Sequence, residues 1–151
     1  GACPRPIRFV MDEDYYHLPV LHYFFRPTRV IPIKLTSGSI RCALNQVKQQ
    51  LEAGELVCIF PEGQLTSDGD MQPFKRGIDL ILKQTPVPVI PIALKGLWGS
   101  YFSREGGRAL LKFPRLCRSK VEVVAGSPVS PSEASSERLF NDVKALRGDI
   151  C

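Results

Sequence analysis

Short apolar runs of strand length alternate with segments of helical spacing, and this alternation constrains the fold more than any other feature of the 151-residue chain. Strand-like runs lie at 7–11, 29–33, 56–60, 87–94 and 121–124. Helical spacing is found at 15–25, 40–51, 74–84 and 139–146. The order predicts an α/β protein with a mixed, largely parallel sheet flanked by helices, in a single domain covering residues 1–151.

Three local patterns sharpen this prediction. Pro32 lies inside the second strand and argues for an edge or irregular position, because proline cannot donate to a ladder. The run Val87–Leu94 is apolar throughout, which indicates a strand buried on both faces, as in a parallel sheet. Ser130-Pro131-Ser132-Glu133 has the spacing of a helix capping box, and Gly148 fits the end of that helix.

Composition limits the partners without choosing one. Twenty Lys and Arg residues against fifteen Asp and Glu give a net charge of +5, which favours phosphate, membrane headgroups, acidic proteins or nucleic acid. No apolar run approaches the ~18 residues that span a bilayer. The five cysteines are widely spaced with no Cys-x-x-Cys, so neither a zinc site nor a disulfide framework is indicated.

The stretch Phe60–Gly69 is the first candidate site, because a polar, glycine-flanked loop follows a strand directly there. Ligands of open α/β sheets bind outside the carboxyl ends of strands, where Glu62 lies. The polar residues Gln64, Thr66 and Ser67 could also hydrogen-bond a hydroxylated substrate. The alternative is a tight turn with a solvated glutamate.

Two basic regions could bind anions. Lys75 and Arg76 lie at the expected start of a helix, where backbone amides favour negative charge, although they could equally form a solvated first turn. The segment Arg104–Lys120 is basic and has aromatic residues within it and beside it. Bases could stack on such aromatics, and headgroups or an acidic carrier protein would suit the segment as well. It could also be a solvated surface.

Several catalytic classes are not supported. The two histidines, His17 and His22, are five residues apart, whereas a helical metal pair needs four. His22 shares the apolar face of its expected helix, which favours a core position. Five residues separate Gly63 from Gly69 where a Walker loop has four, and neither Gly-x-Gly-x-x-Gly nor Gly-x-Ser-x-Gly is present.

Phe60-Pro61-Glu62-Gly63, followed by Gly69 and Phe74-Lys75-x-Gly77, resembles the third block of the glycerophospholipid acyltransferase (lysophosphatidic acid acyltransferase-like) family. Val87–Leu94 resembles the fourth block, and the resemblance implies the fold of that family. Cys3–Asp12 and Leu94–Ser100 are similar to a bacterial branch in which the acyltransferase domain is fused to a transporter-like membrane domain.

The resemblance implies transfer of a fatty acyl group, without metal or other cofactor. The donor would be a thioester of acyl carrier protein or coenzyme A, and the acceptor a glycerophospholipid hydroxyl. The residues that we expect to bind substrate in such an enzyme are Phe60, Pro61, Glu62, Gly63, Thr66, Lys75, Arg76 and Lys34, with Lys75 and Arg76 as the best substitutes for the family's phosphate-binding arginine. Two departures concern the acceptor phosphate: Gln64-Leu65 replaces a usual Thr-Arg, and Lys34 stands where relatives have Arg. Lys34 supplies a charge but not the bidentate fork of arginine.

The family's catalytic His-x4-Asp pair has no counterpart here, since the fifth residue after His17 is His22 and the fifth after His22 is Pro27. We therefore expect an N-terminally truncated fragment, with the pair upstream of Gly1 and no acyl transfer by these residues alone. The resemblance places the whole protein at the cytoplasmic face of the bacterial inner membrane, as part of a larger membrane protein. Its partners would be the thioester donor, a lysophospholipid and the membrane surface, and not nucleic acid. The alternative is a non-catalytic module that binds anionic lipid.

Overall fold

The computed structural model describes residues 5–12, 30–33, 39–64, 66–98 and 120–148. The helix expected at 15–25, the basic residues 104–119 and Lys34 lie outside these ranges. The chain divides into two compact units, one made of residues 1–60 and 80–87 and the other of residues 61–79 and 88–151. Helices and strands occur in both, as the α/β prediction requires, while the expectation of a single domain stays a prediction.

The first unit contains a small parallel sheet. Strand β1 (Ile7–Asp12) is central, with β2 (Ile31–Ile33) on one side and β3 (Leu56–Cys58) on the other, both parallel to it. The register places Ile7 opposite Leu56. Strand β2 is an edge strand, so the position inferred from Pro32 is confirmed.

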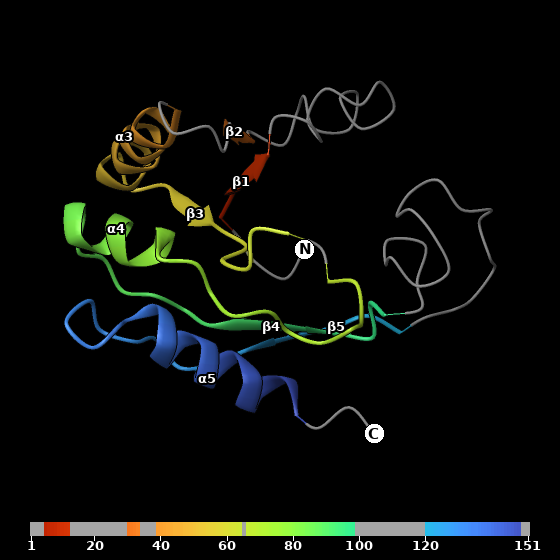
Figure 1. Ribbon diagram of the computed structural model, residues 1–151. Coiled ribbons are helices and arrows are strands. Elements are labelled where there is room, and N and C mark those ends of the chain that lie inside the picture. The colour runs from red at the N-terminus through yellow and green to blue at the C-terminus, as the bar shows by residue number, and fades with distance from the viewer. Residues whose placement is uncertain (1–4, 13–29, 34–38, 65, 99–119, 149–151) are drawn as a thin grey trace. The chain divides into compact units, whose positions relative to one another are not determined.

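Helix α3 (Ser39–Glu52) packs against β2 and β3 of this sheet (Figure 1). Its apolar stripe brings Val47 into the core, where 2% of the residue is exposed, and Ile31 of β2 is buried as well. Gly54 follows the helix with φ of 75°, a left-handed conformation that glycine adopts without strain. An ion pair of 3.4 Å between Arg8 and Glu55 links β1 to the residue preceding β3.

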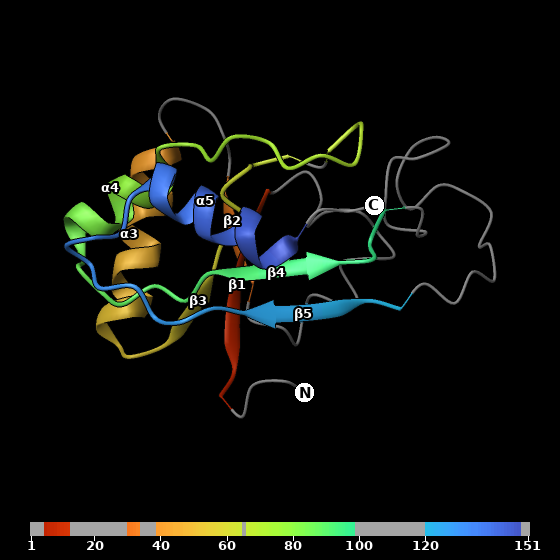
Figure 2. The same cartoon turned by 90° about the horizontal axis from the view of Figure 1, so that it is seen from below.

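The second unit is built on an antiparallel pair of strands. Strand β4 (Ile92–Lys95) pairs with β5 (Glu122–Ala125), with Ile92 opposite Ala125 and Lys95 opposite Glu122. Helix α5 (Ser136–Arg147) packs along β4 (Figure 2). Ala93 of β4 and Leu139 of α5 are buried in the core of this unit.

The expectation that the run 87–94 is buried on both faces of a parallel sheet is wrong. The partner of β4 is antiparallel, and exposure alternates along the strand: Ile92 and Leu94 are 43% and 38% exposed, whereas Ala93 between them is 1% exposed. Ile90 is also exposed. Because successive side chains of a strand point to opposite faces, the helix on one side buries only alternate residues. A continuous apolar run cannot distinguish this arrangement from burial on both sides.

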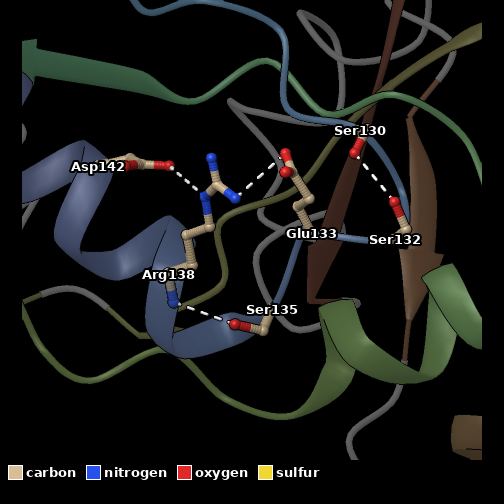
Figure 3. Close-up of polar contacts among 6 residues, drawn as sticks. All are labelled: Ser130, Ser132, Glu133, Ser135, Arg138 and Asp142. Carbon is tan, nitrogen blue, oxygen red and sulfur yellow. Dashed lines mark hydrogen bonds and ion pairs between the residues drawn. The ribbon is translucent and has the colours of Figure 1, made fainter.

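The capping box expected at Ser130 does not cap the last helix. Residues 130–134 form a turn closed by the Ala134 N–H, which donates to the Ser130 carbonyl at 3.0 Å. Ser135 is the N-cap instead, and its hydroxyl accepts the Arg138 N–H at 3.2 Å (Figure 3). The Ser130 hydroxyl lies 3.1 Å from the Ser132 hydroxyl. Gly148 ends the helix with φ of 70°, as expected.

Arg138 lies between two carboxylates at the start of α5 (Figure 3). Its guanidinium is 3.2 Å from Glu133 and 3.8 Å from Asp142. The Glu133 carboxylate therefore pairs with the Arg138 side chain and not with the Ser130 amide, which is the bond that a capping box would require. Exposed pairs of this kind contribute about 0–1 kcal/mol each.

Helix α4 (Gly77–Gln84) begins three residues later than the sequence indicated. The Lys75 N–H donates to the Pro61 carbonyl at 2.8 Å, so the backbone before Gly77 is engaged by the preceding loop and not by a helical turn. The division between the two units falls inside this helix. Within the ranges that the structure describes, no helix is both long and apolar enough to cross a bilayer.

Candidate functional site

The candidate site is the loop formed by residues 61–76, which belongs to the second unit. Two hydrogen bonds close its base. The Gln72 N–H donates to Glu62 Oε2 at 2.7 Å, and the Lys75 N–H donates to the Pro61 carbonyl at 2.8 Å. Bonds to a charged acceptor are stronger than neutral ones, so the Glu62 carboxylate fixes the shape of the loop as well as offering a second oxygen.

Lys75 lies across the backbone of Gly63. Gly63 has φ of 65°, and a Cβ placed on it would lie 2.9 Å from Lys75 Nζ and 3.1 Å from Lys75 Cδ. Glycine adopts this left-handed conformation without strain, and a larger residue would require the end of the lysine side chain to move. The juxtaposition places an ammonium group beside an exposed stretch of main chain.

Lys75 and Arg76 are both exposed. In the described part of the chain, neither forms an ion pair with a carboxylate. Two adjacent cations without an internal counter-ion are suited to an anion from solution. Because α4 begins only at Gly77, the cations precede the helix and are not part of its first turn.

The tip of the loop, residues 66–70, is a tight hydrogen-bonded turn. The Thr66 hydroxyl donates to Asp68 Oδ1 at 2.6 Å and accepts the Gly69 N–H at 3.1 Å, while Asp68 Oδ1 also accepts the Asp70 N–H at 3.0 Å. The bond from Thr66, and then the bond from the Asp70 amide, hold the pKa of the Asp68 carboxyl below its ordinary value. The Thr66 hydroxyl is thus occupied within the turn.

Two further side chains reach this tip. Gly69 is buried with φ of 91°, and a Cβ on it would lie 2.8 Å from Trp98 Cδ2. The Arg147 guanidinium, from the end of α5, donates to the Gly69 carbonyl. Trp98 follows β4 after Gly96, whose φ is 77° and whose Cβ would lie 2.2 Å from the Lys120 carbonyl.

The C-terminal end of the loop is attached to α5. Phe74 and Phe140 form an edge-to-face pair with ring centroids 5.5 Å apart. Asp79 Oδ1, at the start of α4, accepts the Ser136 N–H at 2.8 Å, where a negative charge is favourable at the N-terminus of α5. The loop is therefore held by contacts at its end and its tip.

The structure brings most of the residues predicted to bind substrate into this one loop. These residues are Pro61, Glu62, Gly63, Thr66, Lys75 and Arg76. Phe60 precedes the loop at the end of the first unit and is 54% exposed. Lys34 lies outside the described residues, and its predicted contact with phosphate stays a prediction.

Sequence reasoning did not single out Gln72 and Arg147, and it placed Trp98 beside the basic segment and within the family-like stretch Leu94–Ser100, without a contact to the loop. Gln72 acts through its backbone N–H, and Arg147 acts from a distant helix, so neither has a local motif. The one available signal was the position of Trp98 between Gly96 and Gly99, where a large ring follows a strand directly.

Elsewhere the second unit has a groove of about 390 Å³ along α5, lined by Pro91, Gly126, Ser127, Pro128, Val129, Arg138, Asp142, Ala145 and Leu146. Its charged side chains, Arg138 and Asp142, pair with each other (Figure 3). The groove therefore offers no uncompensated charge to a ligand. No group of three or more His, Cys, Asp or Glu side chains among the described residues could hold a metal ion.

Comparison with known proteins identifies the family. The family described as Acyltransferase matches residues 1–95, which include all of residues 61–76. The chain belongs to this family. The resemblance of Phe60–Gly63 and Val87–Leu94 to glycerophospholipid acyltransferase blocks is confirmed at the level of the family. The fusion to a transporter-like domain and the truncation stay predictions.

Two curated relatives of this Acyltransferase chain are named as 1-acyl-sn-glycerol-3-phosphate acyltransferases. The chloroplastic 1-acyl-sn-glycerol-3-phosphate acyltransferase BAT2 of Brassica napus is 32% identical over 91 residues, covering 59% of this chain and 26% of the relative. The 1-acyl-sn-glycerol-3-phosphate acyltransferase of Bacillus subtilis is 25% identical over 157 residues, covering 99% of this chain and 70% of the relative. The chain spans 26% and 37% of the first two plant relatives.

A solved structure shows the same fold. The 1-acyl-sn-glycerophosphate acyltransferase PlsC of Thermotoga maritima superposes with a TM-score of 0.66 and 23% sequence identity. The match covers 91% of this chain and 54% of the other. The mixed α/β architecture of this Acyltransferase chain is therefore the fold of that enzyme.

Proposed function

We propose that the chain is the acceptor-binding part of a lysophospholipid acyltransferase, with the loop 61–76 as the site for the acceptor's glycerol phosphate. Family membership and relatives named as 1-acyl-sn-glycerol-3-phosphate acyltransferases support this function. The observation that carries it is the position of Lys75, whose ammonium lies beside the exposed main chain of Gly63 without a carboxylate partner among the described residues.

The loop suits a phosphate monoester with an attached glycerol. Lys75 and Arg76 supply two positive charges, and a dianionic phosphate gains more from each than an uncharged ligand would. The open face of Gly63 lets the phosphate or the glycerol approach the main chain closely. Glu62 keeps one carboxylate oxygen on Gln72, and we assign the other to an acceptor hydroxyl.

The chemistry also needs a general base and an acyl donor. In the proposed reaction a base removes the proton of the glycerol hydroxyl, whose oxygen attacks the thioester carbonyl and expels the thiol of coenzyme A or acyl carrier protein. We assign the base to a His-x4-Asp pair outside the 151 residues. We further place the whole protein at the cytoplasmic face of a bacterial inner membrane, where its lipid acceptor resides.

Ligand binding by the chain itself tests this proposal. We expect a short-chain 1-acyl-sn-glycerol 3-phosphate to bind, and the corresponding 1-acylglycerol without phosphate to bind at least tenfold more weakly, since each charged hydrogen bond is worth about 1.5–3 kcal/mol. Replacing Lys75 by Met should remove most of this preference, whereas replacing Lys48, a partly exposed lysine already paired with Glu52, should not.

A second assay addresses the assignment of the base. The 151-residue chain should show no acyl transfer from either thioester, so measurable turnover would contradict the assignment of the base to another segment. Equal binding of the phosphorylated and unphosphorylated acceptors would contradict the role of the loop. Binding to any anionic vesicle, with no preference for a lysophospholipid, would instead favour a lipid-binding module.

A further inference from the structure

The tip of the loop 61–76 is held from outside by two side chains that come from different elements. Trp98 follows β4 and lies against Gly69, with its indole atoms 2.8–3.1 Å from the position of a Cβ on that glycine. Arg147, in the last turn of α5, donates to the Gly69 carbonyl. Gly69 is thus covered on its Cα side and bonded through its carbonyl.

The two contacts do not depend on one another. Trp98 is placed by the path of the chain after β4. The Lys120 carbonyl approaches Gly96 so closely there that a Cβ at this position would clash with it. Arg147 is placed by α5, which packs along β4 and β5. Two elements of the core of the second unit therefore converge on a single loop residue.

The tip and the base of the loop are close in sequence. Between Gly69 and Gln72 lie only Asp70 and Met71, and the Gln72 N–H is the donor that holds Glu62 at 2.7 Å. A shift of Gly69 would therefore disturb the backbone next to the amide that orients the Glu62 carboxylate. Lys75, which lies beside Gly63, follows Gln72 by only three residues along the same loop.

From this arrangement we infer that Trp98 and Arg147 are positioning residues of the acceptor site: they clamp Gly69 so that Glu62 and Lys75 are held ready for the ligand. The inference rests on the proposed function for its ligand, a 1-acyl-sn-glycerol 3-phosphate. Neither side chain needs to touch the acceptor. The clamp lowers the ordering cost of binding, because a loop already fixed loses less conformational freedom when the ligand arrives.

Amide hydrogen exchange of the chain tests the clamp without any ligand. Replacing Trp98 by Ala, or Arg147 by Met, should raise the exchange rates of the Gly69, Asp70 and Gln72 amides on the order of tenfold. The first variant removes the ring that covers Gly69, and the second removes the charged donor to the Gly69 carbonyl. Trp98→Phe, which keeps a flat ring, should stay near the wild-type rates. Amides in β5, in the same unit, should not change and report that each variant is folded.

Arg138→Met is the matched control for Arg147→Met. Both remove an arginine from α5, but Arg138 pairs with Glu133 and Asp142 and makes no described contact with the loop. Its loss should leave the three loop amides unchanged. Equal effects of the two substitutions would show that α5 as a whole, and not the contact with Gly69, supports the loop, which would overturn the inference.

Calorimetric titration with the short-chain 1-acyl-sn-glycerol 3-phosphate completes the test. Trp98→Ala and Arg147→Met should weaken binding about tenfold and Trp98→Phe much less, a rescue that a general loss of stability would not give. If both variants bind the ligand with the affinity of the wild type, the positioning role is overturned. If the wild-type chain does not bind the ligand, the proposed function fails, and the exchange rates alone then decide whether the clamp exists.

Discussion

Replacing Gly63 by Ala tests the contact on which the proposed phosphate site depends. The new Cβ would lie 2.9 Å from Lys75 Nζ and 3.1 Å from Lys75 Cδ and Cε, distances at which the lysine must move. The main chain is also strained, because a left-handed conformation costs roughly 1–2 kcal/mol in a residue other than glycine. The substitution therefore has two effects, one on stability and one on the position of the ammonium.

Gly54 offers a control that separates the two effects. Its φ of 75° is close to the 65° of Gly63, but nothing lies within 4 Å of a Cβ placed on it. Gly54→Ala should thus lower the free energy of unfolding by about the same 1–2 kcal/mol without moving any side chain. Urea unfolding measures this shared cost for the two variants.

Binding of 1-acyl-sn-glycerol 3-phosphate then isolates the lysine. Gly63→Ala should weaken binding about tenfold or more, since a charged hydrogen bond contributes about 1.5–3 kcal/mol, whereas Gly54→Ala should leave it unchanged. Lys75→Met should weaken binding to a similar degree, and the double variant should be no worse than either single one, because both remove the same contact. Full affinity in Gly63→Ala, or additive losses in the double variant, would refute the reasoning.

Three further outcomes are expected. The folded-state pKa of Asp68 is lowered, chiefly by Thr66, so the contribution of this carboxylate to stability is complete above about pH 4 and is lost as the pH falls through the folded pKa. Acid unfolding should therefore depend less on pH in Asp68→Asn, and an unchanged profile would contradict a stabilising role of the Asp68 carboxylate. Burial raises the pKa of the Cys58 thiol, whereas Cys42 is exposed; in single-cysteine variants at pH 8 an aromatic disulfide reagent should modify Cys42 faster, and equal rates would contradict the burial of Cys58. Gly77 begins α4 with nothing within 4 Å of a Cβ, so Gly77→Ala should stabilise the chain by about 0.4–1 kcal/mol in urea unfolding, and a loss of stability would show strain that the geometry does not contain.

The sequence predicts elements well where their signal is local. The periodic residues around Val47 give α3 to within a residue at each end, and Gly54 and Gly148 mark where two helices end. The edge position of β2 is one of the two that Pro32 indicated. In each case the physical cause, helical spacing or a missing donor, lies within a few residues of the feature it predicts.

Features that depend on distant partners could not be predicted in the same way. The start of α4 is set by a bond from Lys75 to Pro61, across the loop. The cap of α5 is at Ser135, and Glu133 pairs with the Arg138 side chain instead of the Ser130 amide.

The same difference between local and distant signals applies to the candidate site. Its motif residues Pro61–Gly63 and Lys75 were identified from the sequence. The contacts of Trp98 and Arg147 with Gly69 join segments far apart in the chain, and no local sequence pattern predicts them.

The order of strands in the first unit has a consequence for synthesis on the ribosome. Strand β1 is translated before β2 and β3, yet both of its ladders are parallel and need those later strands, so Ile7 cannot pair until Leu56 has been made. Parallel pairing across a long connection is slow, and an unpaired apolar strand is open to association meanwhile. Nascent chains that stop before β3 should therefore require a chaperone or aggregate, while chains that extend past it can complete the sheet.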